Sequence, residues 1–372
     1  MQNIETPAIL LNLDVMENNM KNFQQMANAS GKALWPMVKT HKSTEIARMQ
    51  MSYGAAGYLC GTLDECEALV SAGHTNIMYA YPVANEPNIS RVVQLSKDCN
   101  FYIRIDHHMQ AEILNKAAKS AGVCVNYVVI IDSGLKRFGI SPLDIADFVK
   151  VMGHYENLIF KGVSTHPGHV YDFENDVSRV ALAEINAMET ACKVLDRIGI
   201  RPELVTSGST PTFAHVVNAD AINVLHPGNY VFMDNIQVAL GCTDERSIAL
   251  TVLATILSVR KDENGCDVFI IDAGSKCFGD QGVHGSVGLK EKYGQIKNYP
   301  GLELYSLSEE VGKIRGANGT GLTIGDKIEL IPNHSCSVAN MTGWYVCMRG
   351  GSVVGQIAVD IRGNSNGKLY LV

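Results

Sequence analysis

A lysine at the end of an apolar run is the first residue of this sequence that could do chemistry. In "PMVKTHKS" (36–43), three apolar or semi-apolar positions lead directly into Lys39. A lysine at the end of a buried strand can be partly desolvated, which lowers its pKa and frees the neutral amine to attack a carbonyl carbon. The alternative is a surface loop with two solvated lysines, Lys39 and Lys42. This stretch alone leaves both interpretations open.

Two stretches rich in small residues could bind a phosphate group. They are "VTSGSTPTF" (205–213) and "LHPGNYVFMD" (225–234). In barrel enzymes, the loops after strands seven and eight often bind phosphate through backbone N–H groups and small hydroxyls. The candidate ligands are Ser207, Gly208, Ser209, Thr210, Gly228 and Asn229. Ordinary turns are the alternative, because glycine, serine and proline are common in loops of every kind.

Two further stretches place polar and aromatic side chains just after strand-like runs. "IDSGLKRFGI" (131–140) contains Arg137, and "STHPGHVY" (164–171) contains His166 and Tyr171. A guanidinium can hydrogen-bond a phenolate-like oxygen, and an imidazole or a phenol can flank an aromatic ring. Taken singly, Arg137 suits a surface position and His166 a satisfied position inside a barrel. Together with the lysine and the phosphate loops, these residues predict a pocket for pyridoxal phosphate.

A possible metal pair lies far downstream, in "IPNHSCSVAN" (331–340). His334 and Cys336 are two residues apart, so on a strand both side chains would point to the same face. An imidazole and a thiolate are typical zinc ligands, and a site with only two protein ligands leaves room for water and substrate. The alternative is a polar turn with a half-buried cysteine.

The elements that must position these residues alternate between strand-like and helix-like segments. Eight strand-like runs occur before residue 240, at 33–38, 57–60, 76–81, 100–105, 126–132, 158–165, 203–207 and 221–225. Amphipathic stretches separate most of them. This rhythm predicts an α/β fold with a parallel (β/α)8 barrel of the TIM type over residues 14–240. A doubly wound open sheet is the alternative, but no glycine-rich dinucleotide fingerprint follows the first run.

After residue 240 the pattern changes to long alternating runs with Gly-rich turns. We therefore expect an all-β C-terminal domain over residues 241–372. The early run "PAILLNLD" (7–14) precedes the first helix and could pair with this second domain, so residues 1–13 are assigned to it as well.

Composition excludes several classes of protein. The chain has 372 residues, a formal net charge of −7 and no long basic run, which argues against nucleic-acid binding. The N-terminal stretch lacks the pattern of a signal peptide, and no apolar stretch approaches the length of a membrane span. Ten scattered cysteines fit unpaired thiols in a reducing compartment. We therefore expect a cytoplasmic protein.

In combination, these motifs resemble the D-serine dehydratase and D-threonine aldolase family. Its members are metal-activated pyridoxal-phosphate enzymes with an alanine racemase-like fold (fold type III). The resemblance covers essentially the whole chain and depends on "KTHK" (39–42), "DSGLKRFG" (132–139), "GSTPT" (208–212), "HPGNYVF" (226–232) and "PNHSC" (332–336). It implies that Lys39, not Lys42, carries the cofactor as a Schiff base. By the same resemblance, Thr210, Gly228 and Asn229 hold the cofactor, and His334 and Cys336 bind the metal.

The resemblance also implies a reaction. The histidine–x–cysteine pair is similar to the zinc-dependent dehydratase branch, whereas the aldolases have an aspartate in the second place. A lyase of D-3-hydroxy amino acids, dependent on Zn²⁺ or another divalent metal such as Mn²⁺, is therefore expected. It would form a 2-oxo acid and ammonia, and a homodimer is expected. Retro-aldol cleavage, a racemase and a non-catalytic cofactor carrier are the alternatives. One departure concerns "LSEEVG" (307–312), where Val311 replaces a histidine usual in the family.

Overall fold

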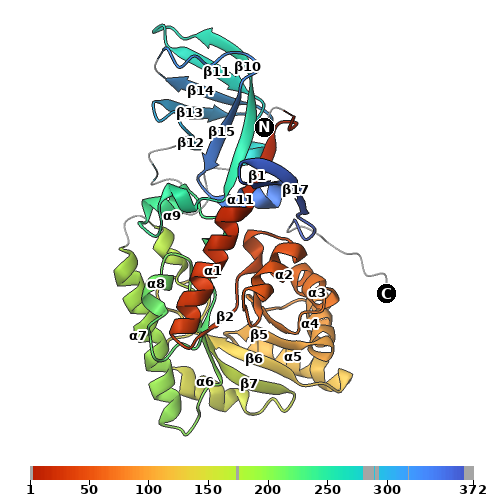
Figure 1. Ribbon diagram of the computed structural model, residues 1–372. Coiled ribbons are helices and arrows are strands. Elements are labelled where there is room, and N and C mark those ends of the chain that lie inside the picture. Colours follow the sequence, from red (N-terminus) through yellow and green to blue (C-terminus); the bar gives the residue numbers. More distant parts are fainter. Residues whose placement is uncertain (1–2, 173–175, 280–288, 290–292, 317, 364–372) are drawn as a thin grey trace.

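The computed structural model describes residues 3–172, 176–279, 289, 293–316 and 318–363, and its strands form two sheets. In Figure 1, the N-terminal two-thirds of the chain surround one sheet, and the C-terminal third forms the other beside it. Helix α1 (Leu13–Ala29) extends from the second sheet along the first. No helix of the described ranges is both long and apolar enough to cross a membrane.

The first sheet is a parallel barrel of eight strands. The strands are β2 (Ala33–Leu34), β3 (Tyr58–Cys60), β4 (Asn76–Tyr79), β5 (Asn100–Ile105), β6 (Val125–Ile130), β7 (Leu158–Ser164), β8 (Leu204–Ser207) and β9 (Val224–Leu225). They follow the order β2-β9-β8-β7-β6-β5-β4-β3, and a parallel bridge from Met37 to Leu59 joins the two ends. The predicted barrel is confirmed, and the open doubly wound sheet is wrong, because the ends of the sheet meet.

Helices follow the barrel strands and cover the outside of the sheet (Figure 1). They are α2 (Thr44–Ser52), α3 (Leu63–Ser71), α4 (Glu86–Asp98), α5 (His108–Ala121), α6 (Ile145–Met152), α7 (Val177–Asp196) and the short α8 (Phe213–Val216). Several begin at a capping side chain: Ser43, Thr62 and Asp176 each accept a hydrogen bond from a backbone amide three residues later. Each such cap stabilises a helix by about 1 kcal/mol.

The inside of the barrel is filled by its own side chains. Trp35, Met78 and Tyr102 belong to one buried apolar cluster there. On β5, Arg104 is two residues after Tyr102, so its side chain lies on the same inner side of the sheet. Phe101 and Ile103 point outward instead, into the main apolar core that the helices cover. Arg104 is thus a buried charged group next to this apolar cluster.

The second sheet has nine strands. These are β1 (Ala8–Asn12), β10 (Leu250–Lys261), β11 (Asp267–Ile271), β12 (Gly294–Ile296), β13 (Leu302–Leu307), β14 (Gly312–Gly316), β15 (Lys327–Pro332), β16 (Trp344–Arg349) and β17 (Ser352–Ala358). The first strand of the chain lies inside this sheet, antiparallel to β10 and parallel to β16. Two short helices, α10 (Ser275–Phe278) and α11 (Ser335–Met341), interrupt the strands.

Candidate active site

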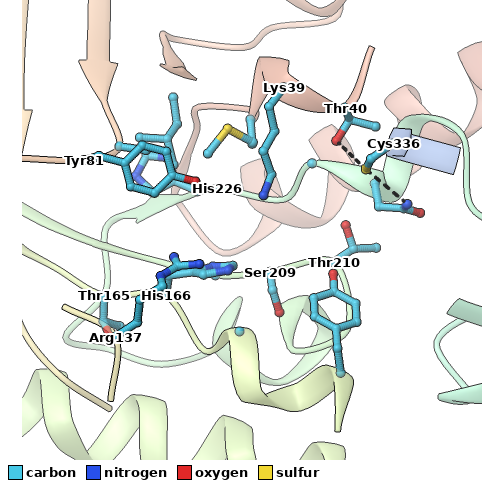
Figure 2. A pocket seen from close by; sticks show the side chains of 18 of the residues that line it. Lys39, Thr40, Tyr81, Arg137, Thr165, His166, Ser209, Thr210, His226 and Cys336 are labelled. Atoms are coloured by element: carbon cyan, nitrogen blue, oxygen red, sulfur yellow. Dashed lines mark hydrogen bonds between the residues drawn. The ribbon is translucent and has the colours of Figure 1, made fainter. Parts of the chain in front are cut away.

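A pocket of about 790 Å³ lies at the carboxyl ends of the barrel strands, where the second sheet approaches the barrel. It brings together eleven of the candidates that the sequence offered, namely Lys39, Arg137, His166, Tyr171, Gly208, Ser209, Thr210, Gly228, Asn229, His334 and Cys336. Ser207, the other candidate for the phosphate loops, does not line the pocket, because its hydroxyl donates to the buried Glu184 instead. Figure 2 shows Lys39 and Cys336 on one side of the space and His166, Arg137 and Ser209 on the other.

Lys39 belongs to a short 3-10 helix, η1 (Val38–Thr40), which directly follows the bridge that closes the barrel. Its side chain is exposed rather than desolvated, because it projects into the open mouth; the expectation of a partly desolvated lysine is wrong in this respect. A Cβ atom added to Gly61 would lie 3.0 Å from Cβ of Lys39, so a larger residue at position 61 would crowd the lysine side chain. Lys42, in contrast, is buried and forms an ion pair with Glu65 at 2.5 Å.

The two predicted phosphate loops are joined to each other by hydrogen bonds. The backbone amide of Tyr230 donates to Oγ1 of Thr210 at 3.0 Å, and this bond ties the loop after β9 to the loop after β8. Gly208 has a φ of 122°, a conformation that favours glycine. A Cβ atom on Gly228 would approach Oγ1 of Thr40 to 2.9 Å. The loops are therefore fixed in place and small enough to leave space for a ligand.

The opposite wall carries cationic and aromatic groups. The guanidinium of Arg137 lies 5.7 Å from the ring centroid of Tyr81, a cation–π distance. His166 lies beside it (Figure 2), and burial, together with the charges of Lys39 and Arg137, holds the pKa of His166 well below its ordinary value. The imidazole is therefore neutral at physiological pH and can pack against a flat ring.

The sequence analysis missed Arg104 and His226, which also line the pocket. Burial lowers the pKa of Arg104 to about 9, and within the described part of the chain its Nε and Nη2 atoms have no hydrogen-bond partner. Nδ1 of His226 contacts the carbonyl oxygen of Trp35 at 2.8 Å, whereas Nε2 has no partner among the described residues. An arginine within the apolar run "NFYIRI" was the available signal.

His334 and Cys336 lie at the start of α11, not on a strand as predicted. Strand β15 ends at Pro332, and α11 begins at Ser335 with His334 as its N-terminal cap residue. The two side chains still reach the same pocket, because the chain turns into a helix between them. The prediction that they share a strand face is therefore wrong, although their proximity is correct.

Asp234 orients the histidine of this pair and was also missed. Its Oδ2 atom lies 3.1 Å from Nδ1 of His334 and accepts hydrogen bonds from the amide of Ser335 (2.9 Å) and from Nδ2 of Asn229 (2.7 Å). With Nδ1 of His334 directed at the carboxylate, Nε2 is the atom left to bind a metal. Asn229 thus connects the phosphate loop to the His334–Cys336 pair.

The electrostatics of the pair suit a metal cation. Burial disfavours a charged His334, but the Cys336 thiolate and Asp234 outweigh it and raise the pKa of His334 to about 10. Burial would raise the pKa of the Cys336 thiol, yet His334 and Lys39 lower it below its ordinary value. Among the described residues no group of three His, Cys, Asp or Glu side chains could hold an ion.

Tyr171 and Val311 differ in their relation to the pocket. Tyr171 ends the 3-10 helix η2 (Gly168–Tyr171), and burial, with the nearby Cys336 and Asp234, raises the pKa of its phenol. Val311 lies in the turn between β13 and β14, where its carbonyl oxygen accepts a hydrogen bond from the amide of Ser308 at 2.9 Å. It is not among the described residues that line the pocket.

Comparisons with known proteins agree over the full length. The "Alanine racemase, N-terminal domain" family model matches residues 11–236, and the "Putative serine dehydratase domain" model matches residues 249–348. D-serine dehydratase of Dictyostelium discoideum is 30% identical, with 92% of this chain and 93% of that protein covered. D-threonine aldolase from Filomicrobium marinum superposes with a TM-score of 0.86 at 25% identity, covering 97% of each chain. A metal-free cysteine-to-alanine mutant of D-threo-3-hydroxyaspartate dehydratase gives 0.88 at 27% identity, covering 97% and 99%.

Proposed function

Because the chain belongs to the family that joins an alanine racemase N-terminal domain to a serine dehydratase domain, we propose that it is a pyridoxal-phosphate- and metal-dependent lyase of D-3-hydroxy amino acids. One observation carries this proposal. An accessible lysine, two small-residue loops and a histidine–cysteine pair, although distant in sequence, line a single pocket. Relatives named as dehydratases and aldolases of such substrates support it.

The residues present fit pyridoxal phosphate. Buried polar atoms of Arg104 and His226, unpartnered in the described part of the chain, require a polar ligand, because burying such groups alone is unfavourable. Gly228 leaves the space that a side chain would fill. Lys39 would hold the cofactor covalently, Ser209, Thr210, Gly228 and Asn229 its phosphate, and Arg137, His166 and Tyr171 its ring. When bound, the cofactor supplies an electron-withdrawing ring that stabilises negative charge on the substrate Cα atom.

Lys39 has the central role among the chain's own groups. Its amine projects into the mouth and can accept the Cα proton of the substrate once the substrate amine has taken its place. The neutral imidazole of His166 forms the opposite wall and adds no competing charge. The second sheet approaches the barrel mouth through His334 and Cys336, which form part of the pocket wall around this amine.

A metal would be held by Nε2 of His334 and the thiolate of Cys336. An imidazole and a thiolate suit Zn²⁺, although another divalent metal such as Mn²⁺ is the alternative. A similar solved structure, a cysteine-to-alanine mutant of D-threo-3-hydroxyaspartate dehydratase, is described as a metal-free form, which supports the proposal that the Cys336 thiolate is a ligand here. When bound, such a metal would supply Lewis acidity to an oxygen atom of the substrate. The chain contributes Asp234, which holds the His334 ring in place.

Dehydration is the reaction we favour. The substrate would lose its Cα proton and its β-hydroxyl group as water, and the product would hydrolyse to a 2-oxo acid and ammonia. The histidine–x–cysteine spacing and the dehydratases among the relatives support this outcome. Retro-aldol cleavage of the Cα–Cβ bond to glycine and an aldehyde is the second candidate, supported by the full-length similarity to an aldolase.

One incubation separates these reactions. The purified protein, supplied with pyridoxal phosphate and zinc, would be mixed with D-serine, D-threonine or D-3-hydroxyaspartate. A 2-oxo acid identifies dehydration, glycine with an aldehyde identifies aldol cleavage, and the L enantiomer identifies a racemase. Absence of all three products, with cofactor bound, would contradict a lyase and favour a cofactor carrier.

We also propose a division of the chain into a cofactor domain over 14–240 and a β-domain over 241–372 together with 1–13. The two family models end and begin on either side of this boundary, at residues 236 and 249. The pairing of β1 with β10 and β16 supports the assignment of the N-terminal residues. A cytoplasmic homodimer completes the proposal.

A further inference from the structure

A buried glutamate lies behind the loop that follows β8. Glu184 is on α7, and its side chain has no exposed surface. It shares the buried face of the helix with Val180, Ala187 and Met188, the spacing of a core-facing apolar stripe. Burying a carboxyl group in such a position costs free energy unless the group forms hydrogen bonds with its neighbours.

Among the residues that the structure describes, the hydrogen bonds of the Glu184 carboxyl group come from the loop over Ser207–Thr212. Its Oε1 atom accepts a hydrogen bond from Oγ of Ser207. The Thr212 hydroxyl and the Gly208 backbone also hydrogen-bond this carboxyl group. Oε2 has no hydrogen-bond partner in the described part of the chain. One carboxyl group thus binds both ends of the loop from behind.

The same loop faces the pocket with its other side. Gly208, Ser209 and Thr210 line the pocket, whereas Glu184 does not. The Gly208 backbone is also hydrogen-bonded to His166, on the pocket wall. Glu184 therefore touches the loop across from the position where a phosphate group would bind.

The charge of Glu184 is poorly stabilised in this place. Burial raises its pKa to about 7, against hydrogen bonds from Ser207, Thr212 and Gly208 that lower it. The elements packed against α7 carry other titratable groups, none of which shifts this pKa. They are Asp147 and Lys150 of α6, Lys161 of β7, His169 and Tyr171 of η2, and His215 of α8.

We propose that Glu184 is a positioning residue for the phosphate loop, and that it takes up a proton when a phosphate dianion binds on the pocket side. The proposal rests on the proposed function, because it needs a phosphorylated ligand. A dianion and a carboxylate on the two sides of one short buried loop repel each other, and protonation removes the repulsion. Phosphate affinity is then greatest while Glu184 is neutral, and it falls as the pH rises through the pKa of the free protein.

The test uses 4-deoxypyridoxine 5′-phosphate, a cofactor analogue that has no aldehyde and so cannot react with Lys39. Its dissociation constant would be measured from about pH 6 to about pH 8.5 for the cofactor-free full chain. The variants are Glu184→Gln, an isostere of the neutral acid, and Glu189→Gln, the same change on the same helix at a residue paired only with Lys193 in the described ion pairs.

We expect the ratio of the two dissociation constants, wild type over Glu184→Gln, to depend on pH. If bound phosphate raises the pKa of Glu184 by about one further unit, this ratio rises about sevenfold between about pH 6 and about pH 8.5. The corresponding ratio for Glu189→Gln stays level. A merely structural Glu184 would change affinity equally at every pH, and that result would overturn the proposal.

A second measurement needs no variant at Glu184. Calorimetry of analogue binding to the wild type, in buffers of different ionisation enthalpy, would show uptake of about half a proton at about pH 7.5, where the phosphate group of the analogue is already a dianion. No uptake at that pH also overturns the proposal. Failure of the wild type to bind the analogue at all would count against the proposed function instead.

Discussion

At the scale of single residues, Lys39 and Lys42 stand on the same turn in opposite surroundings. The backbone of Lys42 has a φ of 52°, which swings its side chain away from the pocket and into the protein. There it meets Glu65, whose other oxygen accepts the amide hydrogen of Gly61 at 2.6 Å. Gly61 in turn borders Lys39. Lys42 thus stabilises the segment at Gly61 that borders Lys39, through Glu65, and of the two lysines only Lys39 projects its side chain into the pocket.

We predict that Lys39→Ala abolishes the near-visible absorbance of the lysine-bound cofactor while leaving the melting temperature close to that of the wild type. Lys42→Ala should keep the absorbance and lose about 3–5 kcal/mol of stability, because it leaves Glu65 buried without its partner. Absorbance spectra and thermal melts of the two proteins check both statements. If the Lys42 variant were the colourless one, the assignment of the cofactor lysine would be wrong.

We predict that Cys336→Ala and His334→Ala each remove the metal and stop β-hydroxyl chemistry, since one remaining protein ligand cannot hold zinc tightly. The absorbance of the lysine-bound cofactor should persist, because neither residue holds the cofactor. Elemental analysis, spectra and turnover would be compared with those of Cys124→Ala, a change at an exposed cysteine. Full turnover by metal-free Cys336→Ala protein would exclude the metal mechanism.

At the scale of elements, all eight barrel runs contain a strand, but most of the strands are shorter than the runs. The run at 33–38 keeps only Ala33–Leu34 as a strand, since Pro36 has no N–H to donate to a ladder. The alternating pattern of apolar residues also does not predict how closely two strands approach each other, as Gly162 on β7 shows. A Cβ atom there would lie 1.8 Å from the carbonyl oxygen of Leu204, so close contact between β7 and β8 requires glycine.

The site was predictable where a motif lies at a strand end, as for Lys39 and the phosphate loops. Asp234 and Glu184 escaped prediction for a different reason. Their partners, His334 and Ser207, lie 100 and 23 positions away in sequence, and the pairing exists only after the elements have packed. The helix at His334 was missed because a spacing of two residues does not distinguish a strand from the first turn of a helix.

We predict that Asp234→Asn weakens metal binding about 10- to 100-fold without unfolding the loop. The Oδ2 atom of Asp234 accepts a hydrogen bond from Nδ1 of His334. The Oδ1 atom accepts one from the amide of Gln237 at 3.1 Å and so caps the N-terminus of α9 (Asn235–Ala239). Asparagine retains the cap but loses the charge that orients the imidazole. Competition with a chelator measures the affinity, and Asp244→Asn, at an exposed aspartate paired with Arg246, is the matched control. Unchanged affinity would remove Asp234 from the metal site.

At the scale of the whole molecule, the pocket belongs to two sheets at once. Barrel loops supply the cofactor groups, and the second sheet supplies His334 and Cys336. The second sheet also presents exposed apolar side chains on its last two strands, namely Trp344, Val353 and Val354. Such a group of apolar side chains on one edge favours association with another surface.

We predict that the active form is at least a dimer, in which the β-domain of one chain closes the barrel mouth of another. A site built from two domains needs such a cover to remain dry. Sedimentation velocity would be combined with activity measured over the same dilution series. A fully active monomer at working dilution would contradict the prediction.

The position of β1 has a consequence for the order in which the chain folds during synthesis. Ala8 pairs with Leu253, and Leu10 with Val346, so β1 is flanked by strands that the ribosome makes only after the whole barrel. Until then, both edges of β1 and its buried Leu11 lack their final neighbours. The second sheet can therefore form only after these later strands have been made, which is a pairing of high contact order. A chain that ended after the barrel would therefore leave both edges of β1 unpaired, and unpaired strand edges favour aggregation.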